Sequence, residues 1–421
     1  MADIPSTPPT KKELGYSSLF RVPEFRPLFL AHLLSLLGVV VSEISLTVLV
    51  YDLTSSPFLS ALTFALGLLP YLVGGTLLSG VADRYPARRV LVVCDLFCAL
   101  CVAGMVWPGT PVAGLLALRC LVAAVAPVFA GTRTATLGDI LGEGELYLLG
   151  RSLLRIVSQS ATLAGFGAGG VLLGFVAPRG AITITAGTFL CSALLLRFGT
   201  ARRPARLRSA RGGPSLLRDS LDGARLVLRD RRLRALMLLF WVPAFFVVAP
   251  EALAAAYTDR IGAGSLGLGL IMCALPVGHI GAELYVGSRL SARARSRLVL
   301  PAASLGLLPL VGYAAAPSLA WAVALGVLVG FSGSYIIGLD QWFVDALPEE
   351  LRGRAMTLQT AGLMTVQGVG MALAGLVAEF VPVRLAVAGA GAVGTLCTLL
   401  LVREIRRTEV RDKADQHMTD R

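Results

Sequence analysis

The stretch PLFLAHLLSLLGVVVSEISLTVLVY, residues 27–51, is largely apolar over the length of a membrane crossing, yet it contains the acid Glu43. About 20 apolar residues wound as an α-helix span the hydrocarbon core of a bilayer. A carboxylate at that depth has no water to solvate it, at a cost of roughly 3 kcal/mol or more. The stretch therefore predicts a transmembrane helix in which Glu43 serves a purpose other than solubility.

The composition extends this prediction to the whole chain. Of 421 residues, 55% are hydrophobic and 15% charged, and the mean hydropathy is +0.74, which is outside the range of soluble domains. The alternating pattern of a membrane β-barrel is absent from the sequence. The net charge of +12 does not indicate nucleic-acid binding, because the basic residues lie between apolar segments. We expect an all-α membrane protein.

The sequence indicates neither an enzyme nor a cofactor. It contains no GxxxxGK[ST] phosphate loop, and nothing in it resembles a catalytic triad. The seven cysteines lie in or beside apolar segments, which predicts neither disulfides nor a zinc site. Cys94, Cys98 and Cys101 share one helical face; metal ligation is one interpretation, and packing of small apolar side chains is the favoured one.

Twelve apolar segments are long enough to be membrane crossings. The predicted spans are 27–51, 58–81, 90–107, 112–135, 153–176, 180–198, 234–257, 265–287, 298–315, 318–339, 355–379 and 384–402. With both termini in the cytoplasm, 34 of the 38 basic residues fall on the inner side and only Arg179, Arg260 and Arg384 fall outside. Because positive charge is retained on the cytoplasmic side, this asymmetry predicts the orientation.

Twelve arginines between Arg197 and Arg234 separate two halves of six spans each. We predict a cytoplasmic tail over 1–24, an N-terminal six-helix bundle over 25–199, a basic cytoplasmic linker over 200–232, a C-terminal six-helix bundle over 233–403 and a cytoplasmic tail over 404–421. The linker is interpreted as a topology determinant lying on anionic headgroups, with regulatory binding as the alternative.

The two halves share spaced features. Arg26 precedes Glu43 by the same 17 residues that separate Arg234 from Glu251. Gly150-Arg151 precedes GFG at 165–167 by the interval at which Gly353-Arg354 precedes GVG at 368–370. Such internal repeats are typical of transporters.

Three ionisable residues from separate spans fall in one layer. Counted from the outer span ends at ~1.5 Å per residue, Glu43 lies about 12 Å deep, Arg119 about 10 Å and Glu251 about 9 Å. Because an unpaired charge in a membrane is costly, we expect Glu43 and Arg119 to pair. Glu251 follows Pro243 and Pro250, which loosen a helix, and is expected to contact substrate or a second proton. A buried packing pair without a transport role is the alternative.

Four further titratable residues have structural interpretations. Asp95 and Glu283, near predicted cytoplasmic helix ends, are expected to form salt bridges with loop arginines. His279, one turn before Glu283, is interpreted as a satisfied interior histidine, with a proton relay as the alternative. The same interpretation applies to His32.

An aromatic cluster lies in the seventh predicted span. We expect it to pack against lipid, with stacking on a ligand as the alternative. Its members are Phe240, Trp241, Phe245 and Phe246.

The loop GVADRYPARR, residues 80–89, joins the second and third spans and resembles the signature loop of the major facilitator superfamily. Its matching residues, expected to act as a cytoplasmic latch, are Gly80, Asp83, Arg84, Arg88 and Arg89. LLALRC around Arg119 resembles the fourth-helix arginine motif linked to proton coupling. FRPLFLAHLLSLLG at 25–38 and LVYDLTSSP at 49–57 are most similar to the bacterial branch with enterobactin exporters and macrolide efflux pumps.

Two segments depart from the family pattern. The equivalent loop of the second half, residues 287–296, has Leu290 where an acid would match Asp83. GFGAGG at 165–170 resembles the antiporter motif of the fifth helix, but Phe166 stands in place of its proline. Its glycines, Gly165, Gly167, Gly169 and Gly170, are expected to allow close helix packing.

The resemblance implies two six-helix bundles around a central cavity lined mainly by helices 1, 4, 7 and 10. It also implies a proton-coupled secondary exporter (an antiporter) of a small amphipathic molecule such as a drug, antibiotic or siderophore, working by alternating access. An importer or uniporter of the same fold and a non-transporting membrane sensor or partner protein are the alternatives. The expected partners are a small-molecule substrate, protons and the lipid bilayer, with no nucleic acid. We expect a monomer, multi-pass in the bacterial cytoplasmic membrane.

Overall fold

The computed structural model describes residues 16–77, 85–142, 144–203, 229–347 and 352–419. These residues form helices and connecting segments, with no strand among them. The first half of the described chain holds the short 3₁₀ helix η1 (Tyr16–Arg21) and the helices α1 (Phe25–Thr54), α2 (Pro57–Leu77), α4 (Ala87–Val106), α5 (Val112–Leu141), α6 (Glu145–Leu172) and α7 (Pro178–Gly199).

The second half contains more and shorter helices. They are α9 (Arg231–Val247), α10 (Ala249–Ala252), α11 (Ala254–Arg260), α12 (Gly264–Arg289), α13 (Ala292–Leu305), η2 (Leu308–Ala315), α14 (Leu319–Ser332), α15 (Tyr335–Ala346), α16 (Arg352–Phe380) and α17 (Val383–Thr419).

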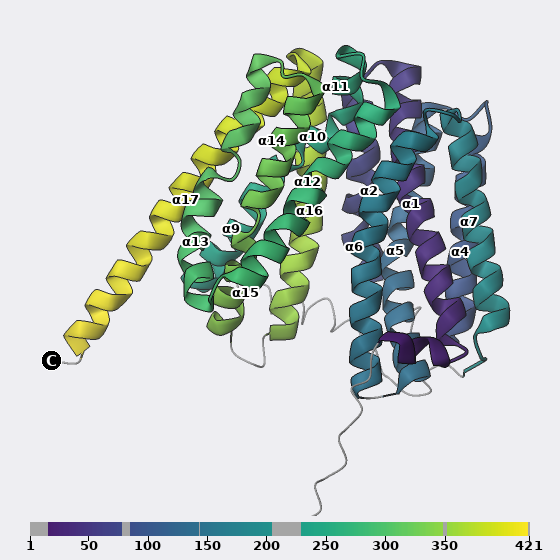
Figure 1. The fold of residues 1–421 in the computed structure, drawn as a ribbon, viewed down its shortest axis with the longest axis horizontal. Helices are drawn as coiled ribbons and strands as arrows, with labels where there is room; N and C mark the ends of the chain where they lie inside the picture. The colour runs from purple at the N-terminus through teal and green to yellow at the C-terminus, as the bar shows by residue number, and fades with distance from the viewer. Residues whose placement is uncertain (1–15, 78–84, 143, 204–228, 348–351, 420–421) are drawn as a thin grey trace, which may run out of the picture.

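Ten helical segments of the described chain are long and apolar enough to cross a membrane. They are Phe25–Thr54, Ala87–Val106, Val112–Leu141, Pro178–Gly199, Arg231–Ala252, Gly264–Val286, Arg293–Ala315, Leu319–Ala346, Leu358–Phe380 and Val383–Arg406. The two other predicted spans correspond to α2, whose apolar part is Pro57–Pro70, and α6. Both are helical and run alongside the rest (Figure 1).

Three predicted spans are interrupted instead of continuous. Residues 234–257 form three helices, residues 298–315 form α13 followed by η2, and residues 318–339 divide between α14 and α15. Pro309 follows the end of α13 and has no N–H to continue its hydrogen-bond ladder. At the α14–α15 break, Gly333 gives room to His279, whose Nε2 would lie 2.2 Å from a Cβ at this position.

The last helix is longer than expected. Its predicted span ends at residue 402, but α17 continues to Thr419, across the segment predicted as a tail. Its end projects away from the other helices (Figure 1) and lies at the same end of the molecule as η1.

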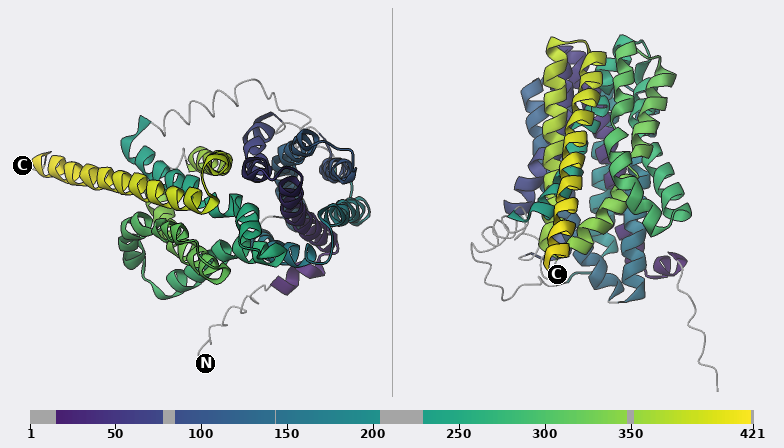
Figure 2. Two further views of the ribbon diagram at one scale, coloured as in Figure 1. Left: turned by 90° about the horizontal axis from the view of Figure 1, so that it is seen from above. Right: turned by 90° about the vertical axis from the view of Figure 1, so that its left-hand side faces the viewer.

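The helices form two groups: seen from above, those of the first half lie to one side and those of the second half to the other (Figure 2). The groups meet along α2 with α16 and along α6 with α12. One end of the molecule holds Arg88 at the start of α4, Arg197 at the end of α7 and Arg231 at the start of α9, and we name it the basic end. The ribbons of the two groups converge at the opposite end, where α10 and α11 lie (Figure 1).

The hydrophobic core follows this division. One cluster of buried residues unites both groups, with Ile44 and Phe64 from the first and Leu253 and Met371 from the second. Other clusters lie within one group, for example Phe240 with Phe343. Only one part of the hydrophobic core is therefore shared between the two groups.

Close helix contacts in the second half rest on glycine. A Cβ at Gly370 of α16 would lie 2.2 Å from the carbonyl oxygen of Phe245 in α9, whereas a Cβ at Gly389 of α17 would meet nothing within 4 Å.

We expect Gly370→Ala to lower the free energy of unfolding by about 1–3 kcal/mol, because backbone must move to admit the methyl group. Gly389→Ala is the control, and we expect it to be neutral or stabilising by up to about 1 kcal/mol. Unfolding in detergent measures both, and equal effects would contradict the contact.

Candidate functional site

The structure brings Glu43 and Arg119 together. Nη2 of Arg119 in α5 donates a hydrogen bond to Oε1 of Glu43 in α1. The side chains are 7% (Arg119) and 16% (Glu43) exposed, so the pair is largely removed from solvent. Each of these two opposite charges stabilises the other, because removal of one leaves the other buried and uncompensated.

Room for the pair comes from Gly67 in α2, a residue that sequence reasoning missed. A Cβ at Gly67 would lie 2.1 Å from Nη2 of Arg119 and 2.8 Å from Oε1 of Glu43. Any side chain here would occupy the space of the ion pair. The only signal in the sequence is a glycine within an apolar helix, and its spacing does not reveal which neighbour it faces.

Hydroxyl groups hold the helices that carry the pair. Thr47, one turn after Glu43, donates to the Glu43 carbonyl oxygen at 2.8 Å, and its hydroxyl lies 2.5 Å from that of Thr63 in α2. Both threonines are fully buried. Arg119 Nε donates to the carbonyl oxygen of Thr63 at 3.4 Å. Helices α1, α2 and α5 are therefore joined by polar contacts at the level of the charges.

Glu251 is the third predicted residue, and it approaches from the other half of the molecule. It lies in α10, is partly buried, and has no hydrogen bond or ion pair with a described residue. Its helix α10 contacts α2, the helix in which Gly67 makes room for the ion pair. The site thus combines one compensated acid, one arginine and a second acid without a bonded partner among the described residues.

The interruption of the seventh span positions Glu251. Pro250 has no N–H to donate, and α9 ends at Val247, just before it. The chain turns at Val248 and again at Leu253, so Glu251 lies on a four-residue helical turn. The structure therefore contains the expected interruption at Pro250, whereas Pro243 lies inside α9, which continues past it. Non-helical backbone at membrane depth is tolerated only inside protein or beside water.

The four glycines of α6 face two different partners. A Cβ at Gly165 would lie 2.7 Å from Val40 and one at Gly169 would lie 2.9 Å from Ile44; these α1 residues flank Glu43. A Cβ at Gly167 would approach Cys273 Sγ at 3.7 Å, and one at Gly170 would lie 2.7 Å from Cα of Gly269. Helix α6 therefore packs on the helix of Glu43 with one face and on α12 of the other half with the other.

The predicted latch lies mostly outside the described residues. Gly80, Asp83 and Arg84 belong to the undescribed segment 78–84, whereas Arg88 and Arg89 begin α4. Arg88 Nη1 donates to the carbonyl oxygen of Thr200, just past the end of α7, at 3.0 Å. The latch role remains a prediction.

The expected salt bridges of Asp95 and Glu283 with loop arginines were wrong. Asp95 is only 1% exposed and accepts hydrogen bonds from the hydroxyls of Ser35 at 3.1 Å and Ser192 at 2.5 Å. It has no ion pair with a described loop arginine, because the two serine hydroxyls occupy its carboxylate oxygens. Glu283 is exposed on α12 and has no ion pair with a described residue.

The two histidines have internal partners. His32 is 1% exposed, lies 3.0 Å from the Ser158 hydroxyl through Nε2, and contacts Arg133 through Nδ1. This agrees with a satisfied interior histidine. His279 is partly buried and packs on Gly333.

Two residues of the aromatic cluster, Phe240 and Trp241, do not face lipid as expected. Phe240 is 4% exposed and meets Phe343 edge-on at 5.8 Å, and Trp241 Nε1 donates to the carbonyl oxygen of Gln359 at 3.1 Å. Helix contacts within the second half take up this face, which periodicity left unassigned. Phe245 and Phe246 contact each other and line an apolar groove of about 380 Å³ with residues of α16 and α17.

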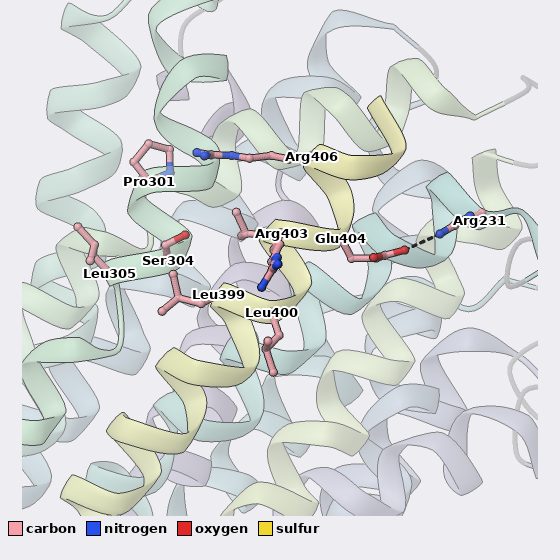
Figure 3. Close-up of a pocket in the computed structure, with 10 residues that line it drawn as sticks. Arg231, Pro301, Ser304, Leu305, Leu399, Leu400, Arg403, Glu404 and Arg406 are labelled. Atoms are coloured by element: carbon pink, nitrogen blue, oxygen red, sulfur yellow. Dashed lines mark hydrogen bonds and ion pairs between the residues drawn. The ribbon is translucent and has the colours of Figure 1, made fainter. Parts of the chain in front are cut away.

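A cavity of about 990 Å³ lies at the basic end of the second half, among α9, α13 and α17. An ion pair between Arg231 and Glu404, at 2.5 Å, lies at one side of it (Figure 3). Arg406 extends from α17 toward Pro301 of α13 (Figure 3). None of the lining residues belongs to the Glu43 site, so volume alone does not identify the functional centre.

The ion pair of Glu43 and Arg119 predicts a strong energetic coupling. We expect Glu43→Gln and Arg119→Gln each to lower the free energy of unfolding by about 3 kcal/mol, because each leaves one buried charge. The double variant should lose about 1–3 kcal/mol less than the sum of the two. Denaturant unfolding in mixed micelles measures this cycle.

The matched control is the pair of Arg203 and Glu24, 2.8 Å apart and 29% and 28% exposed. Its coupling should stay below about 1 kcal/mol, as for other solvent-accessible pairs. Equal coupling in the two cycles would argue against a desolvated pair at Glu43.

Comparison with known proteins identifies the family. The model of the Major Facilitator Superfamily matches residues 28–336 and 245–419. The multidrug efflux pump Tap of Mycolicibacterium fortuitum is 28% identical over 339 residues, covering 74% of this chain and 79% of Tap. The MFS-type transporter y4rN of Sinorhizobium fredii is 29% identical over 288 residues, covering 65% of this chain and 68% of y4rN.

Solved structures share the fold. A point mutant of the nucleoside transporter NupG superposes with a TM-score of 0.69 at 16% identity, covering 89% of this chain and 99% of NupG. At that identity the likeness concerns the fold alone. With apolar helices suited to a bilayer and a family model matched along nearly the whole chain, this multi-pass membrane protein belongs to the Major Facilitator Superfamily of transporters.

Proposed function

We propose that the protein is a proton-coupled exporter of a small amphipathic molecule, and that Glu43 is its proton carrier. The observation that carries this proposal is the desolvated ion pair of Glu43 and Arg119. Intramembrane ionisable groups are expensive and mark ion or substrate pathways. The 28% identity to a multidrug efflux pump supports export of a drug-like molecule.

The proposed architecture has twelve membrane crossings in two six-helix bundles. The ten apolar spans supply ten of these crossings, and α2 and α6 supply the other two. We place the basic end in the cytoplasm, because arginines are retained on that side. Both termini are then cytoplasmic. This orientation is supported by η1 and the end of α17, which lie at the same end of the molecule (Figure 1).

The described conformation is proposed to face the cytoplasm. Contacts between the halves gather at the end opposite the basic end: Gly170 meets Gly269, and Gly375 of α16 approaches Pro57 and Phe58 of α2. The ribbons of the two halves diverge toward the basic end (Figure 1). In alternating access, these contacts must break before the molecule opens outward.

The site provides a way to couple opening to a proton. When Glu43 is ionised, it pairs with Arg119. Protonation of Glu43 weakens this attraction, so that the helices carrying the two side chains can separate. The proton taken up outside is then released inside, while substrate leaves in the opposite phase. Each ligand acts by binding one state better than the other.

The test is transport in proteoliposomes under an imposed pH gradient, with a fluorescent lipophilic cation as the probe. We expect the parent to accelerate with the gradient and Glu43→Gln to lose this acceleration, because glutamine takes up no proton. Glu145→Gln is the matched control, since Glu145 is an exposed acid at the start of α6. We expect it to transport like the parent.

Three outcomes would contradict parts of the proposal. If Glu43→Gln transports as fast and with the same pH dependence as the parent, Glu43 does not carry the proton. Counterflow of substrate without any dependence on pH in the parent indicates a uniporter or importer. The absence of flux for a broad set of compounds in vesicles with folded protein favours a sensor or partner protein.

Glu379 connects the two halves by hydrogen bonds at the end opposite the basic end. Its carboxylate in α16 accepts hydrogen bonds from the Ser56 hydroxyl and, at 3.0 Å, from the N–H of Phe58. These donors lie at the N-terminus of α2, where a negative charge is favourable. Tyr51 adds a contact to Asp259 of α11, at 3.4 Å.

Removal of the Glu379 hydrogen bonds should shift the equilibrium between the inward-open and outward-open conformations. We expect Glu379→Ala to raise the outward-open population, because the α2 N-terminus loses its acceptor. The distance between spin labels at exposed Glu145 of α6 and Asp345 of α15 should then shorten at the basic end. Glu404→Ala, which breaks an exposed ion pair within the second half, is the control. An unchanged distance distribution in Glu379→Ala would show that this contact does not hold the state.

A further inference from the structure

A cavity rich in arginine lies on the first half of the molecule, away from the Glu43 site. It has a volume of about 480 Å³ and lies at the basic end, between the start of α4 and the end of α7. Five of its eight lining residues are arginines. The lining residues are Pro86, Arg88, Arg89, Val92, Val93, Arg197, Arg202 and Arg203.

Most of this charge is not compensated within the described chain. Arg203 pairs with Glu24 at 2.8 Å. Arg88 donates to a neutral carbonyl, that of Thr200, at 3.0 Å. Arg89 and Arg202 are exposed and have no ion pair with a described residue. Like charges gathered in one cavity repel each other, so an anion bound among them would relieve that repulsion.

Apolar side chains continue from the cavity into the membrane. On α4, Val93, Leu96 and Leu100 are 57%, 47% and 72% exposed, at helical spacing that places them on one face. On the neighbouring α7, Leu190, Leu194 and Phe198 are also exposed and follow one another at intervals of four residues. An exposed apolar stripe on each helix thus leads to the arginines.

This combination selects a ligand with an anionic head and apolar tails. Arginine guanidinium groups bind phosphate oxygens with paired hydrogen bonds. A free phosphate would use the arginines alone and leave the two stripes without a role. A zwitterionic phospholipid would bring a positive group to a cavity that is already positive.

We propose that this cavity binds the headgroup of an anionic phospholipid, such as phosphatidylglycerol, from the leaflet at the basic end. Its phosphate lies at Arg89 and Arg202, and its acyl chains lie along the exposed faces of α4 and α7. The bound lipid bridges the two helices on the outside of the first half. This site lies away from Glu43, and it includes Arg88 and Arg89 of the predicted latch.

The comparable cavity of the second half is less positive. Its arginines are Arg231, Arg403 and Arg406, and Arg231 is paired with Glu404 (Figure 3). In this cavity, Arg403 and Arg406 lie outside the ion pair with Glu404. In the cavity of α4 and α7, four arginines lie outside the ion pair of Arg203 with Glu24. We therefore assign the anionic lipid to the cavity of α4 and α7.

Native mass spectrometry of the delipidated full-length protein, titrated with phosphatidylglycerol, tests this site. We expect one tightly bound lipid in the parent, and roughly 30-fold weaker binding in Arg89→Gln/Arg202→Gln, about fivefold for each arginine lost near an anionic headgroup. Arg293→Gln/Arg297→Gln is the matched control. It removes two exposed arginines from α13 at the same end of the molecule, and we expect its affinity to equal that of the parent.

The single variant Arg202→Gln covers the case in which the double variant fails to fold, because Arg202 lies outside any helix. We expect it to bind about fivefold more weakly. Equal losses in the two double variants would reduce the effect to general surface charge and overturn the proposal. Parent binding of phosphatidylcholine as tight as that of phosphatidylglycerol would overturn it too. Displacement of the lipid by an equal concentration of inorganic phosphate would instead assign the site to a free anion.

Discussion

A carboxylate and a guanidinium that are both removed from water are tolerated only as a pair, and this constraint organises the first half of the molecule. Glu43 and Arg119 come from α1 and α5, and Gly67 of α2 leaves the space in which they meet. Threonine hydroxyls and the glycines of α6 fix the surrounding helices. The pair therefore depends on packing by helices that carry no charge at this level.

The same constraint connects the two halves. Glu251 stands on the short helical turn α10, next to Pro250, and this turn contacts α2 of the first half. Helix α6 contacts α1 on one side and α12 on the other. A change in the charge of Glu43 therefore acts next to the contacts between the halves, as the proposed proton coupling requires.

Charge plays a different role at the membrane boundary. Buried acids such as Asp95 are satisfied by hydroxyls, whereas arginines collect at the basic end, where headgroups and water compensate them. This difference follows from the local dielectric constant. Inside the bilayer an ion needs a fixed protein partner, whereas at the membrane surface mobile groups such as water can compensate its charge. The α4–α7 cavity and the Glu43 site are two solutions to the same electrostatic problem.

The sequence by itself determined that this is an all-helical membrane protein, because twenty-residue apolar runs have few other solutions in a bilayer. It also pointed to Glu43, Arg119 and Glu251, because charge within such runs is rare. The pairing of Glu43 with Arg119 followed from the cost of an unpaired charge, but only the tertiary structure decided the other contacts. Helical periodicity places a residue on a face but not against a partner, so the role of Gly67, the hydroxyl partners of Asp95 and the internal packing of Phe240 and Trp241 were hidden. Breaks at Pro309 and Gly333 were equally hidden, since an apolar run looks continuous until neighbouring helices compete for its backbone and space.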